Sequence, residues 1–356
     1  MKQLMRKLLS IIILLSILAP LPSWGALSFS DEIKSIYNSY SNYLDTQWTG
    51  SGWNYSVPSR HYQETDKNSA SNLRMQATLA TAYRFRTDEE SARKIRAAIV
   101  SVLGPDKPMV HSIKNQGKTV STRSFHDMIG LYLALRVLEE REDVFGWAEK
   151  ALLIGKIEQI FPWALAGLDN ENRALLSAAY GLAILHHPLT NFSPALQKRY
   201  AKQIRDKIKV GLKAVDSSGV YHESAGKQYS LHYHLVSALM LSYLGQNLPD
   251  KNYAALARKM LTRTHGWYKL GKLNWQGSFR PTGIGLQTVL LRALGEKYLG
   301  NKNWLSYWQA EKKNRGFIDA AHPQRLVWKD DVDNTLNDDY SFMNMAELFI
   351  RIAEPL

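Results

Sequence analysis

The chain has 356 residues, no cysteine, and 45 lysines and arginines against 32 aspartates and glutamates, which gives a formal net charge of +13. The lack of cysteine excludes disulfides, cysteine nucleophiles and thiolate metal sites, and a chain of this length buries a sufficient core without such crosslinks. The positive charge favours an anionic polymer as partner, either an acidic polysaccharide or a nucleic acid, although many proteins are basic without such a partner.

The first 26 residues have the order of a secretory signal peptide. Basic residues precede a mainly apolar run over 8–19, and the small pair Gly25 and Ala26 follows it. The run is shorter than the roughly 20 residues that a membrane span needs, and no later apolar run is long enough either. We therefore expect cleavage near Ala26, a mature chain of residues 27–356 that is periplasmic or secreted, and no membrane-spanning segment.

Apolar residues recur at helical spacing along most of the mature chain. The predicted helices cover 31–43, 70–103, 124–141, 146–160, 172–187, 194–215, 227–245, 251–271, 284–299 and 340–353. Glycine and proline punctuate the pattern between them, and strand-like alternation never extends beyond a few residues. No linker divides the pattern, so we expect one all-α domain over 27–356.

Several predicted helices, such as 172–187, are rich in alanine and leucine on almost every face. A helix of this kind is covered on both sides. Successive helical hairpins, stacked as an inner and an outer layer, bury such a pattern. The predicted architecture is therefore an (α/α) toroid or an incomplete barrel of helical hairpins, with a broad groove at the end where loops join the helices.

The most informative stretch is 219–234, in which a glycine-led turn carries the acid Glu223 and leads into a predicted helix. Tyr229, His232 and Tyr233 are spaced to share one face of that helix. Such a face offers proton donors and acceptors to a ligand lying across it. The combination favours acid–base chemistry on a sugar.

Each of these residues also has a purely structural interpretation. Glu223 is placed to pair with Lys227 on the surface, and Tyr233 also suits an ordinary core position. His234 lies off the face of Tyr229 and Tyr233, so we expect it to be packed and hydrogen-bonded rather than catalytic.

A second candidate group lies at the start of the predicted helix 172–187. The amide of Asn172 or the guanidinium of Arg173 can neutralise a substrate carboxylate, which stabilises the enolate-like intermediate formed when a base removes the neighbouring ring proton. Asn172 equally suits a helix cap, and Arg173 equally suits a solvated first turn.

A third candidate group opens the predicted helix 124–141. Arg123 and His126 beside a helix N-terminus form a compact corner for an anion, and His126 could supply a base or an acid. In the structural interpretation, a neighbouring hydroxyl residue caps the helix and Asp127 is a favourable acid of its first turn.

The segment 275–283 is a further candidate loop. Arg280 can grip a carboxylate, and Trp275 can stack on the flat C–H face of a sugar ring, although half-buried packing suits any one tryptophan as well. His232 and His234 are two residues apart, the wrong spacing for one helical face to bind a metal, and no His-Glu-x-x-His or Gly-x-Ser-x-Gly occurs. We expect neither a metal nor a cofactor.

The sequence Leu231-His232-Tyr233-His234, with a glycine turn and an acid before it, resembles the catalytic helix of the alginate lyases that have an (α/α)-toroid fold. The resemblance implies that Tyr233 is the catalytic tyrosine. It also implies that Asn172, at the start of an alanine-rich helix upstream, is the asparagine that neutralises the substrate carboxylate.

Two positions depart from the pattern of that family. Arg173 stands where the family has a histidine, and Gly226 stands where it has a catalytic arginine, with the cation Lys227 next to it. The resemblance therefore indicates a polysaccharide lyase more strongly than it indicates alginate as the substrate.

These observations predict an exported polysaccharide lyase that cleaves a uronic-acid-containing anionic polymer, alginate-like or glucuronan-like, by β-elimination. Tyr233 is the expected acid and a candidate base, with nearby cations stabilising its phenolate. The expected catalytic residues are Tyr233, Asn172, Arg173, His126 and His232, and the expected substrate-binding residues are Tyr229, Lys227, Glu223, Arg123, Arg280 and Trp275.

Three other functions fit parts of the pattern. A glycoside hydrolase on the same toroid would use Glu223 together with Asp127 or Asp339, because hydrolysis needs two carboxyl groups flanking the bond. A catalytically inactive protein that binds acidic polysaccharide would explain the replaced residues at 173 and 226. A nucleic-acid binder would explain the charge, but the export signal counts against it.

Overall fold

The computed structural model describes most of the chain between residues 70 and 273. The described residues are 34, 37–38, 40–42, 44–50, 70–104, 112–115, 118–121, 124–167, 169, 171–223, 228–250, 252–269, 272–273, 295, 316–318, 326–329 and 336–337. The predicted helices 284–299 and 340–353 lie outside these residues apart from Gly295. In the part described, no helix has both the length and the apolar character that crossing a bilayer requires.

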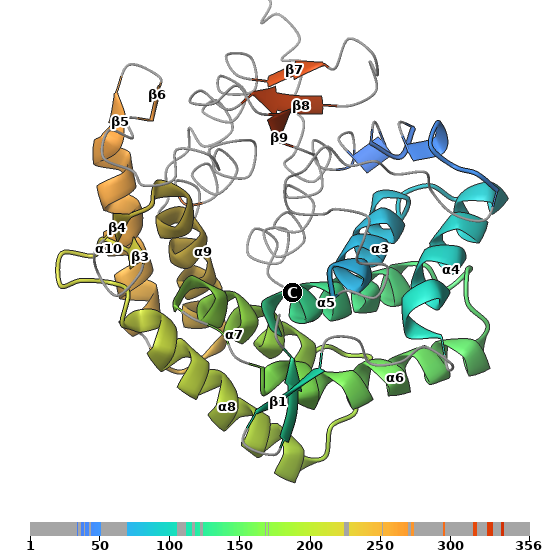
Figure 1. Ribbon diagram of the computed structural model, residues 1–356, viewed down its shortest axis with the longest axis horizontal. Helices are drawn as coiled ribbons and strands as arrows, with labels where there is room; N and C mark the ends of the chain where they lie inside the picture. Colours follow the sequence, from blue (N-terminus) through green and yellow to red (C-terminus); the bar gives the residue numbers. More distant parts are fainter. Residues whose placement is uncertain are drawn as a thin grey trace, which may run out of the picture.

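Eight helices form a curved double layer (Figure 1). The inner helices pack against one another in chain order: α3 (Ala70–Ala82), α5 (Ser124–Glu140), α7 (Glu171–Leu185) and α9 (Leu231–Asn247). Each is followed by an outer helix that packs on it: α4 (Glu89–Leu103), α6 (Trp147–Leu165), α8 (Pro194–Leu212) and α10 (Asn252–Trp267). The predicted all-α (α/α) toroid is confirmed.

Burial follows the two layers. Almost every described side chain of α5, α7 and α9 is buried. Helices α5 and α7 are covered by an inner helix on each side and by the outer layer, and α9 packs against α7 and α10. An outer helix instead buries one stripe, as α8 does with Tyr200, Ile204 and Ile208, and leaves its other face exposed. The alanine- and leucine-rich pattern of 172–187 therefore marks an inner helix.

The predicted helix 70–103 is two helices, α3 and α4, separated by residues 83–88. The Asp88 side chain caps α4, accepting hydrogen bonds from the backbone N–H of Ser91 at 2.8 Å and from its hydroxyl at 2.7 Å. Burial alone would raise the pKa of Asp88, but the bonds from Ser91 and the charge of Arg86 lower it to about 2. Helix α4 therefore starts inside a continuous apolar pattern.

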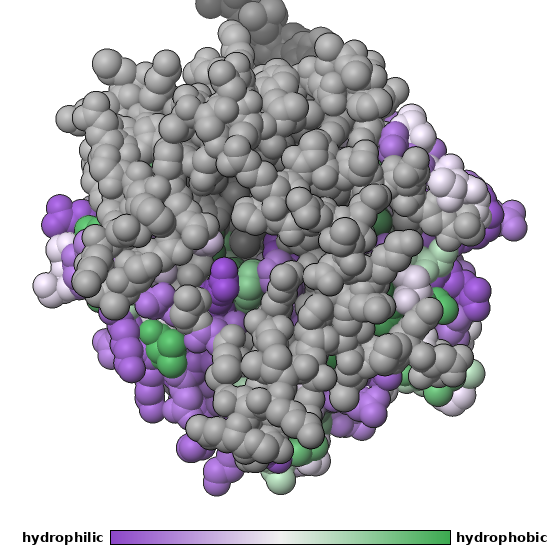
Figure 2. Space-filling model, in the orientation of Figure 1, coloured by the Kyte–Doolittle hydropathy of each residue, from purple (hydrophilic) through white to green (hydrophobic). Residues whose placement is uncertain are grey.

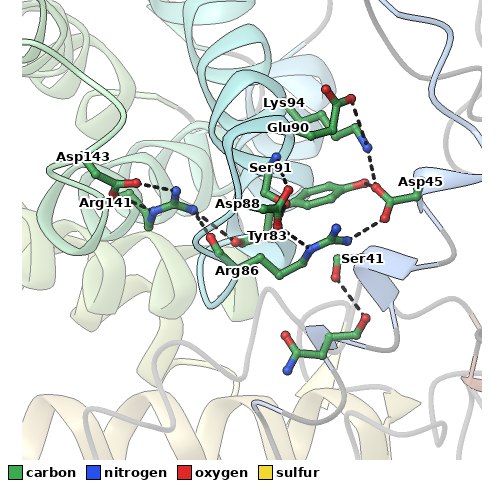
Figure 3. Close-up of polar contacts among 11 residues, drawn as sticks. Ser41, Asp45, Tyr83, Arg86, Asp88, Glu90, Ser91, Lys94, Arg141 and Asp143 are labelled. Atoms are coloured by element: carbon green, nitrogen blue, oxygen red, sulfur yellow. Dashed lines mark hydrogen bonds and ion pairs between the residues drawn. The ribbon is translucent and has the colours of Figure 1, made fainter.

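A network of charges closes the end of the toroid at which α3 and α5 finish (Figure 3). Asp45 accepts hydrogen bonds from the Tyr83 hydroxyl at 3.0 Å and from Arg86 at 2.6 Å, and it also pairs with Lys94. Burial opposes ionisation of Asp45, but these donors hold its pKa below the usual value. Arg141, just after α5, donates to the carbonyl of Arg86 at 2.6 Å. This end is thus stabilised by paired charges.

Short β-hairpins, which the sequence pattern did not predict, occur in the connections between pairs of helices. The strand pairs are β1 (Ser112–Asn115) with β2 (Lys118–Ser121), β3 (His222–Glu223) with β4 (Gln228–Tyr229), β5 (Tyr268–Lys269) with β6 (Lys272–Leu273), and the sheet of β7 (Gly316–Ile318), β8 (Leu326–Lys329) and β9 (Leu336–Asn337). With two to four residues each, they are too short to show alternation. The hairpins β1–β2 and β3–β4 lead into α5 and α9, so they lie at the end where inner helices begin.

Candidate functional site

The inner helices begin at the same end of the toroid, and this brings three predicted residues together. Each inner helix is followed by an antiparallel outer helix, so α5, α7 and α9 run in the same direction side by side. His126, Arg173 and Tyr233 are each the third residue of one of these helices. Residues far apart in the sequence therefore lie in the first turns of neighbouring helices.

The His126 ring is held by Arg74, a buried residue in the second turn of α3. Arg74 Nη1 lies 3.1 Å from His126 Nδ1. Because a guanidinium can only donate, His126 Nδ1 accepts this bond and the imidazole carries its proton on Nε2. In this tautomer the donor of the His126 ring is Nε2–H.

Arg173 completes an electropositive corner with these two residues. Its guanidinium lies 5.3 Å from the centre of the Phe125 ring, and that ring lies 4.0 Å from the ring of His126. The Arg173 side chain is exposed and forms no ion pair with any carboxylate in the described part of the chain. An exposed arginine on an aromatic face is well placed to bind an incoming anion.

Helix α9 begins later than the sequence pattern predicts. The Ser230 hydroxyl accepts a hydrogen bond from the backbone N–H of Tyr233 at 3.4 Å, which makes Ser230 the N-cap and Leu231 the first helical residue. Tyr229 lies in β4, opposite His222 in β3. The prediction that Tyr229 shares a helical face with Tyr233 is therefore wrong.

Tyr233 itself is half-buried beside a second tyrosine. Its ring centre lies 6.4 Å from that of Tyr221, which is fully buried. Tyr221 stands at the end of the turn that follows α8, in an isolated bridge with Val215. The turn thus supplies one wall against which the candidate catalytic tyrosine packs.

His234 has a structural role, as expected from its position off the active face. Its Nδ1 accepts the backbone N–H of Tyr221 at 3.2 Å, and its Nε2 donates to the carbonyl of Met260 at 3.0 Å. Burial lowers the pKa of His234 to about 4. A neutral His234 therefore ties the turn before α9 to α10.

This buried histidine predicts a loss of stability in acid. The unfolded imidazole takes up a proton near pH 6.5, whereas the folded one resists protonation down to about pH 4, so the unfolded state binds more protons between these values. The contribution of His234 to the free energy of unfolding is complete above pH 6.5 and falls by about 3 kcal/mol as the pH drops to 4. Urea denaturation between pH 7 and 4.5 should show this slope in wild type and a weaker slope in His234→Gln. Equal slopes would contradict the assignment.

The turn at 216–220 is held by Asp216, a residue that the sequence analysis missed. Asp216 Oδ1 accepts hydrogen bonds from the backbone N–H groups of Ser218 at 2.8 Å and Val220 at 3.0 Å, and Oδ2 lies 2.8 Å from His222 Nε2. Burial opposes ionisation, but these donors hold the pKa of Asp216 well below its usual range. Gly219 adopts φ +82°, which a side chain would strain. The turn is therefore rigid where it approaches the candidate site.

The segment before α7 is fixed by a nearly buried ion pair. Asp169 Oδ2 accepts hydrogen bonds from Lys207 Nζ at 2.6 Å and from the Ser177 hydroxyl at 2.6 Å, and Lys207 also donates to the carbonyl of Gly167 at 2.8 Å. The side chains of Asp169 and Lys207 are 1% and 12% exposed. Lys207 on α8 thereby anchors the segment that leads into α7, the helix that carries Arg173.

Other predicted residues are placed only by the backbone or lie outside the described residues. Asn172 and His232 are the second residues of α7 and α9, and Glu223 is the last residue of β3. The remaining predicted residues, which lie outside the described part, are Arg123, Lys227, Trp275 and Arg280. Among the described side chains, no three His, Asp or Glu groups gather closely enough to hold a metal ion.

Comparison with known proteins identifies the fold. No protein-family model matches the chain, and comparison with curated proteins gave no significant match. A mutant of unsaturated glucuronyl hydrolase from Streptococcus agalactiae has a TM-score of 0.59 at 10% identity, over 91% of this chain and 90% of that chain. A sugar epimerase from a ruminal bacterium scores 0.57 at 11% identity, over 93% and 100%. A polysaccharide lyase scores 0.53 at 11% identity, over 92% and 96%. These likenesses establish a shared (α/α)-toroid fold.

Proposed function

We propose that this chain is a polysaccharide lyase that cleaves a uronate-containing polymer by β-elimination at the end of the toroid where the inner helices begin. The observation that carries the proposal is the position of the exposed Arg173, beside Phe125 and His126 and in the helix layer that also holds Tyr233. A carboxylate-binding cation and a phenol can supply the charge neutralisation and the proton transfer that this elimination requires.

The chemistry follows from the groups present. Arg173, with Asn172 next to it, binds the uronate carboxylate and stabilises the negative charge that develops when the neighbouring ring proton is removed. His126, protonated on Nε2, adds a hydrogen-bond donor there. Tyr233 takes the ring proton as base and passes it to the leaving glycosidic oxygen as acid. One C–H bond and one C–O bond break, and one C=C bond and one O–H bond form, without water.

The structural neighbours support a carbohydrate-processing enzyme. Their names include a polysaccharide lyase, a sugar epimerase and an unsaturated glucuronyl hydrolase, all on the fold of this chain. From the signal-peptide pattern over 1–26 we also propose that residues 27–356 work outside the cytoplasm, where acidic polysaccharides occur.

Replacing Arg173 tests its role at the carboxylate. We expect Arg173→Gln to lower kcat/KM by about 10²- to 10³-fold, as loss of one charge-stabilising donor does in other enzymes. Arg173→Lys should restore part of the loss, because the charge returns without the bidentate geometry. A polymer whose carboxylates are methyl-esterified provides the control, since wild type and Arg173→Gln should act on it equally. If Arg173→Gln lowered kcat/KM on the ester as much as on the free acid, carboxylate binding by Arg173 would be contradicted.

A glycoside hydrolase is the second candidate, favoured by the glucuronyl hydrolase among the structural neighbours. It would require two carboxyl groups about 5–10 Å apart across the bond. Asp127 stands next to His126 on α5 but is only 2% exposed, and Asp339, the other candidate partner of Glu223, lies outside the described residues.

Ultraviolet absorbance separates the two functions. Elimination creates a C4–C5 double bond conjugated to the carboxylate, so a lyase raises the absorbance as it cuts. We would mix the mature protein with alginate blocks, glucuronan, pectate, hyaluronan and heparan-type polymers. A rise on one polymer supports the lyase and names its substrate class, whereas new reducing ends without a rise support the hydrolase.

A further inference from the structure

The charges of the outer layer are distributed unevenly. On α4 and α6 the exposed cations are paired, for example Arg93 with Glu90 at 2.7 Å and Arg96 with Glu149 at 2.7 Å. Helices α8 and α10 carry one acid, Asp206. The exposed cations on these two helices and at the C-cap of α8 are Lys198, Arg199, Lys202, Arg205, Lys209, Lys213, Arg258, Lys259 and Arg263. The edge of the molecule formed by α8 is accordingly hydrophilic in Figure 2. We call these cations the basic face.

The centre of the basic face is a stripe of four cations along α8. Lys198, Lys202, Arg205 and Lys209 follow one another at intervals of three or four residues, so they lie on one side of the helix, away from the buried stripe that packs on α7. The stripe is about 16 Å long, with a cation about every 5 Å.

Within the described part of the chain, the positive charge of this stripe is only partly neutralised. Asp206 approaches Lys209 at 3.2 Å and Lys202 at 3.8 Å, while Lys198 and Arg205 form no ion pair with any described carboxylate. The structure itself therefore contains more positive than negative charge here, and an external anion can compensate it.

The basic face leads to the end of the toroid that holds the candidate site. The end of α8 lies against the start of α7, since a side chain on Gly211 would meet the carbonyl of Glu171 at 3.0 Å. From α10, Lys259 donates to the carbonyl of Ser217, and Arg263 approaches that of Ser218 at 3.4 Å. Both carbonyls belong to the turn 216–220, which continues into Tyr221 beside Tyr233.

We propose that the basic face is a second binding surface for acidic polysaccharide, which holds a stretch of the polymer outside the site where it is cut. A polyuronate carries one carboxylate on each sugar, and a row of cations at every helical turn matches such a repeating charge. Nucleic acid is less well matched, because single strands need aromatic platforms and no exposed side chain described on α8 or α10 is aromatic. The identity of the polymer rests on the proposed function, whereas the location of the surface does not.

Two variants of equal charge test this surface. The stripe variant combines Lys198→Gln, Lys202→Gln, Arg205→Gln and Lys209→Gln, and the control variant combines Arg93→Gln, Arg96→Gln, Lys150→Gln and Lys156→Gln on α4 and α6. Both remove four positive charges, from exposed positions in the stripe variant and from exposed or partly buried positions in the control variant, and outside the buried core such substitutions have small effects on stability. Any difference between them therefore reports where the polymer binds.

Binding is measured in the Tyr233→Phe background, so that the polymer is not cut, and circular dichroism checks the fold of each variant. We expect the stripe variant to bind a long polyuronate about tenfold more weakly, with a shallower dependence of log Kd on log salt concentration, as expected when ionic contacts are lost. The control variant should bind as the parent does. A short oligouronate, which fills the catalytic end only, should bind equally to all three.

Kinetics with Tyr233 intact give the second measurement. The stripe variant should show a raised KM on long polymer and an unchanged kcat on short oligosaccharides. Equal behaviour of the stripe and control variants would overturn the second surface and leave the lyase standing. Stripe-dependent polyuronate binding without any turnover would support the surface and contradict the lyase. Stripe-dependent binding of DNA or of anionic vesicles, but not of polyuronate, would overturn the proposal.

Discussion

Tyr233→Phe is expected to lower kcat by about 10²- to 10⁴-fold, the usual contribution of a general acid or base. The substitution removes only the hydroxyl, so the ring packing against Tyr221 remains. Circular dichroism and the affinity for uncut polymer should therefore match wild type. The measurement is turnover of the polymer that the wild-type protein cuts, at saturating concentration.

Tyr243→Phe is the matched control for this change. Tyr243 lies on the same helix, α9, but is 8% exposed and far from the first turn that carries Tyr233. It should retain nearly full kcat. Comparable activity in the two variants would show that the phenol of Tyr233 does not take part in the chemistry.

The second large effect is expected on the stability of the protein when Lys207 is replaced. Lys207→Met leaves the carboxylate of Asp169, which is 1% exposed, without its cation. Removing one partner of a buried ion pair costs about 3–5 kcal/mol, because the remaining charge is desolvated and uncompensated. We therefore expect the free energy of unfolding, measured by urea denaturation at pH 7, to fall by this amount.

Lys209→Met provides the comparison for Lys207→Met. Lys209 stands two residues away on α8, is 73% exposed, and pairs with the surface residue Asp206. Its replacement should change the free energy of unfolding by less than about 1 kcal/mol. The double variant Asp169→Asn with Lys207→Met should recover part of the loss, because it removes the isolated charge. A small effect of Lys207→Met alone would show that the pair is solvated rather than buried.

Most of the helical fold could be predicted because periodicity is a local property of the sequence. The predicted 124–141, 172–187 and 194–215 correspond closely to α5, α7 and α8, whose starts are marked by good capping or first-turn residues. That a helix such as 172–187 is covered on both sides also followed from composition, since it is rich in alanine and leucine on almost every face.

The errors in the predicted fold have physical causes. The start of α9 was placed too early because Tyr229 continues the helical spacing, whereas the Ser230 cap and the pairing of β4 with β3 end the extended segment there. The break between α3 and α4 was missed because apolar spacing continues across Asp88, which nevertheless caps a new helix. Local hydrogen bonds of this kind outweigh periodicity.

The site was only partly predictable, because its supporting contacts join residues distant in sequence. His126 and Arg173 were proposed from their chemistry at predicted helix starts, and Tyr233 from its neighbours in a predicted helix and from the resemblance to the alginate lyases. The bond from Arg74 to His126 spans 52 residues, and the pair of Lys207 with Asp169 spans 38. No local pattern encodes such pairs, so the tautomer of His126 and the anchoring of α7 emerge only from the packing of neighbouring helices.

The most direct test of the proposed chemistry is the mass of the cleavage products formed in water enriched in ¹⁸O. Elimination adds no water, so each cut gives one fragment whose new non-reducing end carries a double bond and which is lighter by one water than the hydrolysis product. Neither fragment carries the label at first cleavage. We predict unlabelled, unsaturated oligouronates from wild type and none from Tyr233→Phe. Saturated fragments that carry one ¹⁸O at the new reducing end would contradict the lyase and establish hydrolysis on this toroid.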